Sequence, residues 1–303
     1  MALSKEVQAG IDFAEQMGFT KMHLSPPTKT RTMMAQAPKS PNPTEVGNVI
    51  NKVIIGTQGD ISIRLYIPKG NDTFPVISFF HGGGFVLMSI DTHDEICRQI
   101  CSNTNAIVMS VEYKLAPENP FPAGNIDSLD ATKWLIKNVI NFGGDGTKLA
   151  VVGDSAGGYM ALDVAQKLRD ENIELKAQMV AYPVTDHYSS NHHSWEENKE
   201  GYILSAEIMK WFWDNFITDA SKFESASPLR TKDFSNLAPA MIMTCNYDPL
   251  RDEGKAYADK LKNAGVETIY ENYENVHGFF GTGEMGQEAM RKACEFLKEK
   301  LNN

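Results

Sequence analysis

Short apolar runs alternate with amphipathic stretches along most of this chain. Eight segments have the apolar character of strands, and several are continuous runs of the kind found in strands that are covered on both faces. These strand predictions cover residues 51–55, 61–67, 76–80, 106–111, 149–152, 177–181, 241–245 and 267–270. Helical spacing covers residues 4–17, 91–102, 125–139, 156–169, 251–264 and 287–301. We expect Asp91 and Asn125 to be the N-caps of two of these helices.

The alternation of strands and helices predicts an α/β fold with a mostly parallel sheet and helices on both faces. The first two strands are joined by the short segment GTQGD, which indicates an antiparallel hairpin at the start of the sheet.

Two segments depart from this rhythm. Residues 25–47 contain several prolines, which predict a loop or an extended arm. Residues 186–219 are rich in aromatic side chains and have helical spacing where they are regular. Because this second segment is longer than a crossover helix needs, we interpret it as an insertion that covers part of the molecule.

Composition and charge exclude several classes of function. The chain has 303 residues, of which 42% are hydrophobic and 22% are charged, as in an ordinary globular protein. Its formal charge of −10 disfavours nucleic acid or an anionic membrane as a partner. The N-terminal segment lacks the apolar core of a signal peptide, and no run reaches transmembrane length, so we expect a cytoplasmic location.

The four cysteines are Cys97, Cys101, Cys245 and Cys294. They form no C-x-x-C pair, and no Cys/His cluster has the spacing of a zinc site. We therefore expect buried, reduced thiols, and the sequence predicts neither a metal nor a cofactor.

The clearest motif is Gly153-Asp154-Ser155-Ala156-Gly157, which lies between a predicted strand and a predicted helix. In a G-x-S-x-G turn the serine projects from a tight bend, and the glycines on either side allow other backbone to approach closely. Ser155 would also lie at a helix N-terminus, where unpaired N–H groups favour negative charge. Ser155 is therefore the candidate nucleophile.

A second glycine-rich stretch, HGGGF at residues 81–85, follows the buried strand predicted at 76–80. Glycines there would leave backbone N–H groups bare, and a serine nucleophile that attacks a carbonyl needs such donors for the oxyanion. We interpret His81 as a residue that orients this loop.

A serine nucleophile also requires a base and an acid that orients it. Of the seven histidines, His277 follows the last strand, at the sheet edge where open α/β sheets bind ligands. Asp248 follows the preceding strand, and we prefer it to Asp252, which with Glu253 is expected to form ion pairs or helix caps. The chain order Ser155, Asp248, His277 is the order expected for an α/β-hydrolase.

Together these motifs resemble the hormone-sensitive-lipase-like branch of the α/β-hydrolases, the bacterial HGGG carboxylesterases. The segments HGGGF, VEYKLAPENPFPA, GDSAGG, SPLR, DPLRDEG and VHGF occur in that family's order. The resemblance implies an α/β-hydrolase fold with a helical cap, and a catalytic triad of Ser155, Asp248 and His277.

The resemblance also implies oxyanion donors at the backbone N–H groups of Gly83, Gly84 and Ala156, with the role of Gly82 left open. It divides the chain into a catalytic core, residues 47–185 and 226–303, and a cap, residues 1–46 and 186–225.

Substrate-pocket candidates come from the segments around these motifs. Met88 and one residue of the aromatic cluster at 211–213, preferably Trp211, could line an apolar pocket, although helical aromatics often belong to the core. Phe85 and Asp154 complete the candidates.

The predicted function is a serine carboxylesterase for short- to medium-chain esters. Two alternatives are an amide or formamide hydrolase with the same triad, because the constellation serves both bonds, and a non-catalytic small-molecule binder on the same fold. The chain could be a monomer or a homodimer.

Overall fold

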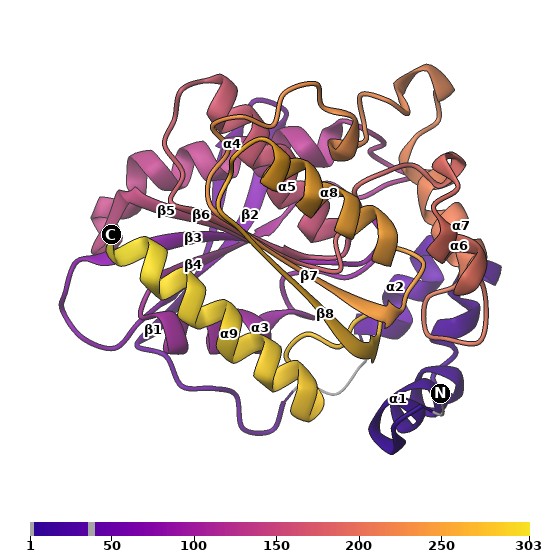
Figure 1. Ribbon diagram of the computed structural model, residues 1–303. Coiled ribbons are helices and arrows are strands. Elements are labelled where there is room, and N and C mark those ends of the chain that lie inside the picture. Colours follow the sequence, from indigo (N-terminus) through magenta and orange to yellow (C-terminus); the bar gives the residue numbers. More distant parts are fainter. Residues whose placement is uncertain (1–2, 36–39) are drawn as a thin grey trace.

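An eight-stranded sheet runs through the centre of the computed structural model, which describes residues 3–35 and 40–303. The strand order is β1-β2-β4-β3-β5-β6-β7-β8 (Figure 1). The β1–β2 and β2–β4 pairs are antiparallel, and every later neighbouring pair is parallel. The predicted hairpin and the predicted α/β-hydrolase fold are therefore confirmed.

The strands have the following bounds: β1 (Asn48–Gly56), β2 (Gly59–Ile67), β3 (Phe74–Phe80), β4 (Ile107–Glu112), β5 (Gly144–Asp154), β6 (Ala177–Ala181), β7 (Ala240–Tyr247) and β8 (Thr268–Val276). The α-helices are α1 (Lys5–Gln16), α2 (Pro27–Ala35), α3 (Asp94–Thr104), α4 (Ala123–Asn138), α5 (Ala156–Asp170), α6 (His193–Glu197), α7 (Ala206–Phe216), α8 (Arg251–Asn263) and α9 (Gly283–Asn302). Short 3₁₀ turns are η1 (Phe19–Leu24), η2 (Val139–Phe142), η3 (Tyr188–Ser190), η4 (Ala220–Lys222) and η5 (Pro228–Arg230).

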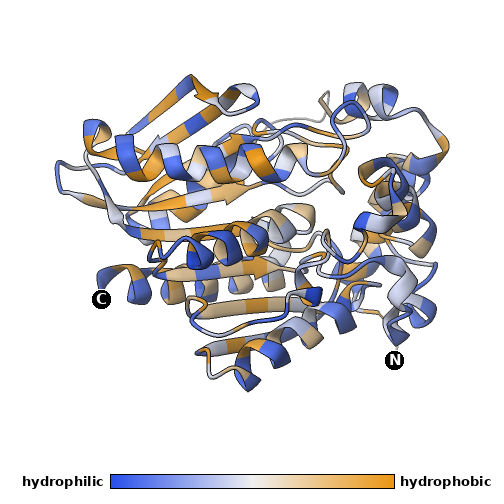
Figure 2. Ribbon diagram, turned by 90° about the horizontal axis from the view of Figure 1, so that it is seen from above, coloured by the Kyte–Doolittle hydropathy of each residue, from blue (hydrophilic) through white to orange (hydrophobic). Residues whose placement is uncertain are grey.

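Helices cover both faces of the sheet. α3 and α9 pack together on one face, while α4, α5 and α8 lie on the other (Figure 1). The helices are banded in orange and blue, whereas the strands in the middle of the sheet are mostly orange, as expected for strands buried between two helical layers (Figure 2).

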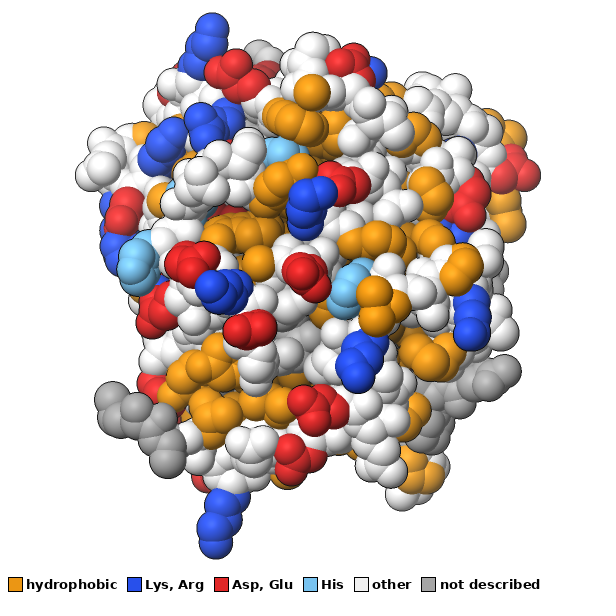
Figure 3. Space-filling model, turned by 90° about the vertical axis from the view of Figure 1, so that its right-hand side faces the viewer, with side chains coloured by type: hydrophobic (Ala, Val, Ile, Leu, Met, Phe, Trp, Pro, Cys, Tyr) orange, Lys and Arg blue, Asp and Glu red, His pale blue; other side chains and the backbone are white. Residues whose placement is uncertain are grey.

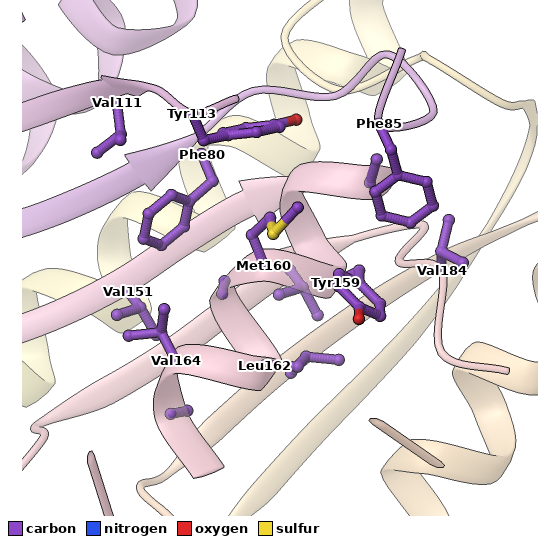
Figure 4. Close-up of a cluster of buried hydrophobic side chains, with 14 of the residues drawn as sticks. Phe80, Phe85, Val111, Tyr113, Val151, Tyr159, Met160, Leu162, Val164 and Val184 are labelled. Atoms are coloured by element: carbon purple, nitrogen blue, oxygen red, sulfur yellow. The ribbon is translucent and has the colours of Figure 1, made fainter. Parts of the chain in front are cut away.

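The sheet core packs directly against the helix that follows β5. Phe80, Val111 and Val151, from three neighbouring strands, lie with Met160 and Val164 of α5 in one buried cluster (Figure 4). Full burial of one such side chain contributes about 1.5–3 kcal/mol. This packing fixes α5, and with it the turn that carries Ser155.

All eight predicted strands are present, but some are longer than their apolar runs. β8 was expected to end at residue 270, and it continues to Val276 because its backbone keeps pairing with β7, up to the pair Tyr247–Val276. The C-terminal half of β8 alternates between buried and exposed positions, so it contains no continuous apolar run from which a strand could be predicted.

The prediction of a loop or extended arm over residues 25–47 is wrong for its first part, where α2 forms. Pro27 occupies the first helical position, where the missing N–H leaves no hydrogen bond unmade. Residues 36–39 of the predicted arm, and residues 1–2 of the predicted cap, lie outside the described residues.

The two predicted N-caps are also wrong. α3 begins at Asp94 with His93 as its N-cap, while Asp91 forms an ion pair with Arg64 at 2.8 Å. Asn125 lies inside α4, where its side chain donates to the Tyr159 hydroxyl. Both side chains therefore make tertiary contacts in place of the local caps that the sequence suggested.

The N-terminal segment and the insertion after β6 lie at the same end of the molecule (Figure 1). α7 contacts η1, so these two segments, far apart in the sequence, form one layer. We call this layer of α1, η1, α2, α6, α7 and their connections the cap layer. Apolar side chains gather among charged ones on this end of the surface (Figure 3).

Two further observations concern the sequence predictions. All four cysteines are buried and unpaired, as expected. Over residues 3–35 and 40–303, no helix combines the length and the apolar character that crossing a bilayer would require.

Candidate active site

Three side chains meet beyond the carboxyl ends of the parallel strands. Ser155 follows β5, Asp248 follows β7, and His277 follows β8. His277 Nε2 lies 2.9 Å from Ser155 Oγ, and His277 Nδ1 lies 2.7 Å from Asp248 Oδ2. Because a carboxylate only accepts, Nδ1 donates to Asp248, which leaves Nε2 to accept the serine proton in the neutral ring.

The protein holds Asp248 rigidly. Its side chain is fully buried, and its Oδ1 accepts from the Leu250 backbone N–H at 2.9 Å. The ring of Tyr182 lies against the His277 ring, with centroids 4.5 Å apart. The acid and the aromatic ring together fix the imidazole in the orientation that faces Ser155.

The turn at Ser155 has the strained backbone expected of a nucleophile at a strand-to-helix bend. Ser155 has φ 54° and ψ −121°, a region that non-glycine residues rarely occupy. Its own N–H donates to the Ala181 carbonyl on β6 at 2.9 Å. A Cβ at Gly157 would collide with the Phe80 carbonyl on β3, which explains the second glycine of the motif.

The glycine-rich loop after β3 lies beside this turn because β3 and β5 are neighbours in the sheet. Gly83 and Gly84 have φ values of 110° and 59°, which glycine adopts without the penalty of a side chain. A Cβ at Gly84 would also collide with the ring of Phe212 on α7. The loop therefore combines an unusual backbone with direct contact to the cap layer.

Gly82, whose role the sequence left open, uses its N–H elsewhere. That N–H donates to Asp154 Oδ1 at 3.0 Å, and the same carboxylate oxygen lies 3.2 Å from His93 Nε2. Burial raises the pKa of Asp154, but the neighbouring His93, His81 and His277 together more than offset this, so the pKa lies below its ordinary value. We infer that Asp154 anchors the start of the loop and that Gly82 is not an oxyanion donor.

His81 also lies in the interior at the base of this loop. Its ring stacks on Tyr113 with centroids 4.4 Å apart, and the Tyr113 hydroxyl donates to the His81 carbonyl at 2.6 Å. Burial lowers the pKa of His81 to about 3, so the ring is neutral. These contacts are consistent with the predicted orienting role.

A mostly apolar cavity of about 240 Å³ opens at Ser155. The core contributes its polar edge, including Gly83, Gly84 and His277. The cap layer contributes the following apolar side chains: Phe19, Met22, Met34, Ile203, Leu204 and Phe212. A larger, polar hollow of about 590 Å³ lies along α5 and residues 221–233, and none of the three meeting side chains lines it.

Two of the four pocket candidates line the cavity and two do not. Met88 and Asp154 are part of its wall. The prediction that Phe85 lines the pocket is wrong, because its ring is buried and stacks on Phe216 with centroids 3.9 Å apart. The prediction for Trp211 is also wrong, since the next residue of α7, Phe212, lines the cavity in its place.

The remaining acids predicted near the site have structural contacts. Asp252 forms an ion pair with Arg251 at 2.9 Å, as expected. Glu253 is instead fully buried and accepts from the Thr185 N–H at 2.8 Å and from Trp195 Nε1 at 3.0 Å. Burial raises the pKa of Glu253 to about 8. This residue joins helix α8 of the core to α6 of the cap layer.

Sequence reasoning did not identify His93 or Tyr182. Neither belongs to a motif, and both reach the site only through the fold, His93 from the start of α3 and Tyr182 from the end of β6. Phe212 did carry a signal, as a member of the aromatic cluster on a predicted helix. Within the described residues, no group of three or more His, Cys, Asp or Glu side chains is arranged to hold a metal.

Comparison with known proteins points to one family. Residues 77–281 match a family model described as the alpha/beta hydrolase fold. The chain is 36% identical over 259 residues to esterase LipI of Mycobacterium tuberculosis, covering 83% of this chain and 80% of that protein. It is 37% identical over 238 residues to an ethyl acetate hydrolase of Pseudomonas putida, covering 76% and 74%.

A solved structure resembles the whole chain. An ester hydrolase from the metagenome of Lake Arreo, in complex with a bipyridine phosphonate derivative, superposes with a TM-score of 0.91 at 35% identity and covers 100% of both chains.

Proposed function

This chain belongs to the hormone-sensitive-lipase-like branch of the α/β-hydrolase family, and we propose that it is a serine carboxylesterase in which Ser155, His277 and Asp248 form the catalytic triad. The observation that carries the proposal is the continuous hydrogen-bonded relay from Asp248 through His277 to Ser155 Oγ, at 2.7 and 2.9 Å. The relay ends in an apolar cavity beside the glycine-rich loop.

In the acylation step, His277 Nε2 takes the Ser155 proton while Oγ attacks the ester carbonyl. The oxyanion is stabilised by the backbone N–H groups of Gly83, Gly84 and Ala156, the last of which opens α5 and has no partner within the helix. The imidazolium then gives its proton to the leaving alcohol. Asp248 stabilises the imidazolium and holds its tautomer.

In the deacylation step, the same imidazole activates a water molecule, which attacks the acyl carbonyl. The Ser155–acyl bond breaks, the serine recovers its proton from His277, and the carboxylic acid leaves. Neither step requires a cofactor, because Ser155 supplies the nucleophile, His277 transfers the protons and the backbone N–H groups stabilise the oxyanion.

The cavity supports esters with short- to medium-chain acyl groups as substrates. Its wall is mostly apolar, and the volume of about 240 Å³ is below the range of about 300–1,000 Å³ that drug-sized ligands occupy. An acyl chain therefore fits better than a bulky or charged acid.

The relatives favour this function over the two alternatives. They are named for ester hydrolysis, so none of them supports an amide or formamide hydrolase. A non-catalytic binder would not need the imidazole of His277 hydrogen-bonded to Ser155. The homodimer and the cytoplasmic location stay predictions.

A substrate panel tests the proposal. We expect the purified enzyme to hydrolyse p-nitrophenyl acetate, butyrate and hexanoate faster than the laurate and faster than butyryl p-nitroanilide, and a serine-directed phosphonate to abolish all of these activities. Faster cleavage of the anilide than of the matched butyrate would favour the amide hydrolase. Absence of hydrolysis of any activated ester would overturn the proposal.

A further inference from the structure

The cap layer makes a buried polar contact with the segment that carries Asp248. This contact comes from Asn198, the residue at the C-terminal end of α6, which is only 2% exposed. Asn198 Nδ2 lies 3.1 Å from the Asn246 carbonyl oxygen and 3.1 Å from the Asp248 carbonyl oxygen. Because an amide nitrogen carries two hydrogens and a carbonyl oxygen only accepts, one side chain donates to the backbone on both sides of Tyr247.

The backbone just before Asp248 is irregular, so regular strand pairing alone does not fix it. β7 pairs with β8, but the register shifts between Cys245 and Tyr247. The Asn246 carbonyl lies within this irregular stretch, and the Asp248 carbonyl lies beyond the end of β7. The same two carbonyls also accept from Arg251 of α8, the first from Nη1 and the second from the backbone N–H, both at 3.2 Å. The chain that leads into Asp248 is therefore held from two directions, by the core helix α8 and by the cap layer.

Helix α6 is itself hydrogen-bonded to this segment, which orients Asn198. Ser194 Oγ donates to the Pro249 carbonyl at 2.6 Å, and the Ser194 N–H donates to Asp252 Oδ2 at 2.8 Å. The Asn198 N–H donates to the Ser194 carbonyl at 2.9 Å, so the two residues lie one helical turn apart on the same face. The Asn198 amide therefore reaches the two carbonyls from a helix that is already fixed to the same part of the core.

We propose that Asn198 is a positioning residue for the reaction: by holding the two carbonyls, it keeps the Asp248 carboxylate within hydrogen-bond distance of His277. The proposal rests on the proposed function, in which Asp248 stabilises the imidazolium. The contact that it protects is the 2.7 Å hydrogen bond between His277 Nδ1 and Asp248 Oδ2, and a small misplacement of such a group lowers turnover strongly. Asn198 is not part of the wall of the cavity at Ser155, so it acts on the reaction through Asp248.

This role separates Asn198 from the cap residues that line the cavity. A cavity residue changes turnover according to the acyl chain that it contacts, whereas a carboxylate displaced from His277 slows every ester by the same factor. We expect loss of the Asn198 donors to lower kcat about tenfold, well below the roughly 10⁴-fold loss expected when the acid itself is replaced by its amide. The loss is smaller because Arg251 still donates to both carbonyls.

A double-mutant cycle between Asn198 and Asp248 tests the proposal. Asn198→Ala and Asn198→Asp are made in the wild type and in Asp248→Asn. For each protein, kcat and KM are measured with p-nitrophenyl acetate, butyrate and hexanoate at a temperature below its thermal unfolding. Asn198→Asp keeps the size of the side chain but removes the amide donors, so it separates the hydrogen bonds from packing. Asn215→Ala is the matched control, because this asparagine of α7 donates its amide to the Trp211 carbonyl within its own helix.

In the wild-type background, both Asn198 variants should lower kcat about tenfold for all three esters, with KM and the Asn215→Ala control within about twofold of the wild type. In the Asp248→Asn background, the same substitutions should change kcat by less than about twofold, because the group through which Asn198 acts is already lost. An equal loss in both backgrounds, a loss that depends on acyl length, or wild-type turnover in Asn198→Asp would each overturn the proposal. The Asp248→Asn protein is measured first, so wild-type turnover in that variant would show separately that the proposed triad is wrong.

Discussion

The core and the cap layer contribute to the site in different ways. From the core come polar groups that are fixed by strand ends and by buried hydrogen bonds, as with Asp248 and its Leu250 N–H donor. From the cap layer come apolar side chains such as Met22 and Phe212, which touch the cavity through packing alone. In the proposed mechanism the core thus supplies the reacting groups, and the cap layer supplies most of the apolar wall, which Leu87 and Met88 of the core complete.

This difference has a physical basis. A proton relay tolerates little displacement, because hydrogen bonds weaken steeply with distance and angle, so its members lie at the ends of strands in one continuous sheet. Apolar contact is non-directional, and helices that pack against the core can supply it with less precise placement. The two regions meet where Phe212 lies on Gly84 and where Trp195 donates to Glu253.

The largest expected loss of turnover comes from a substitution in the core. Ser155→Ala removes the nucleophile but keeps the backbone, and kcat for p-nitrophenyl butyrate should fall on the order of 10⁶-fold, as when the serine of a triad is removed. Thermal unfolding of the variant should stay close to that of the wild type. Turnover within tenfold of the wild type would show that the relay is not the catalytic apparatus.

The next largest loss of turnover is expected from a substitution at the contact between the core and the cap layer. Gly84→Ala places a methyl group into the ring of Phe212 and forces the loop to move, so one oxyanion donor should be misplaced, at a cost of about 100- to 1,000-fold in kcat.

The double variant Gly84→Ala/Phe212→Ala separates contact with the cap from backbone strain. If the Phe212 ring is the main obstacle, the double variant should have a kcat at least about tenfold higher than that of Gly84→Ala. Phe212→Ala alone is the reference. If kcat does not rise in the double variant, the loss in Gly84→Ala comes from the positive φ of residue 84 in the core and not from its contact with the cap layer.

A smaller effect concerns the anchor of the loop. Asp154→Ala removes the closer acceptor of the Gly82 N–H and leaves only His93 Nε2, at 3.4 Å, which costs about 1–3 kcal/mol for a poorly paired buried donor. We expect kcat to fall by about 10- to 100-fold with little change in KM, because the loss is felt in the placement of the oxyanion donors.

Asp154→Asn serves as the conservative control, since its side-chain oxygen can still accept from Gly82. It should keep most of the wild-type kcat. Equal losses in both variants would assign the effect to the charge opposite His93 and not to the hydrogen bond.

The smallest effect is on stability, at the joint between core and cap layer. The pKa of Glu253 is about 8 in the folded protein, above its ordinary value of 4.5. The folded state therefore binds this proton more tightly than the unfolded state does, and the resulting stability is complete below about pH 4.5 and is lost as the pH rises to about 8.

Urea unfolding at pH 5.5 and pH 8 measures this loss. The free energy of unfolding of the wild type should fall by about 1–2 kcal/mol more over this interval than that of Glu253→Gln, within the limit of about 1.4 kcal/mol per pH unit for one group. Parallel behaviour of the two proteins would mean that Glu253 stays ionised throughout.

The sequence anticipated the core better than the cap layer. β3, β5 and β6 are buried on both faces and appear as continuous apolar runs, so the loops that carry Ser155 and the glycines could be located. The prediction of a loop or extended arm is wrong at α2. A proline usually indicates a break in a helix, and the sequence alone does not show that Pro27 occupies the first position of one.

Pocket residues were harder to predict for a geometric reason. Successive residues of a helix point about 100° apart, so whether Trp211 or Phe212 faces Ser155 depends on how α7 is rotated against the core. Phe85 failed for a related reason, because its side chain turns away from the glycine loop into the stack with Phe216. His93 came from a segment that no motif marks.

The contact between Phe212 and Gly84 restricts how this protein can diversify. Most cap residues that line the cavity, such as Met22 or Leu204, can change size and alter selectivity while the proposed catalytic atoms remain undisturbed. Phe212 packs against Gly84, one of the proposed oxyanion donors, so we expect a replacement at position 212 to change selectivity and turnover together. Laboratory evolution toward new esters should therefore find its early gains on the N-terminal helices and reach the middle of α7 only with a compensating change in the glycine loop.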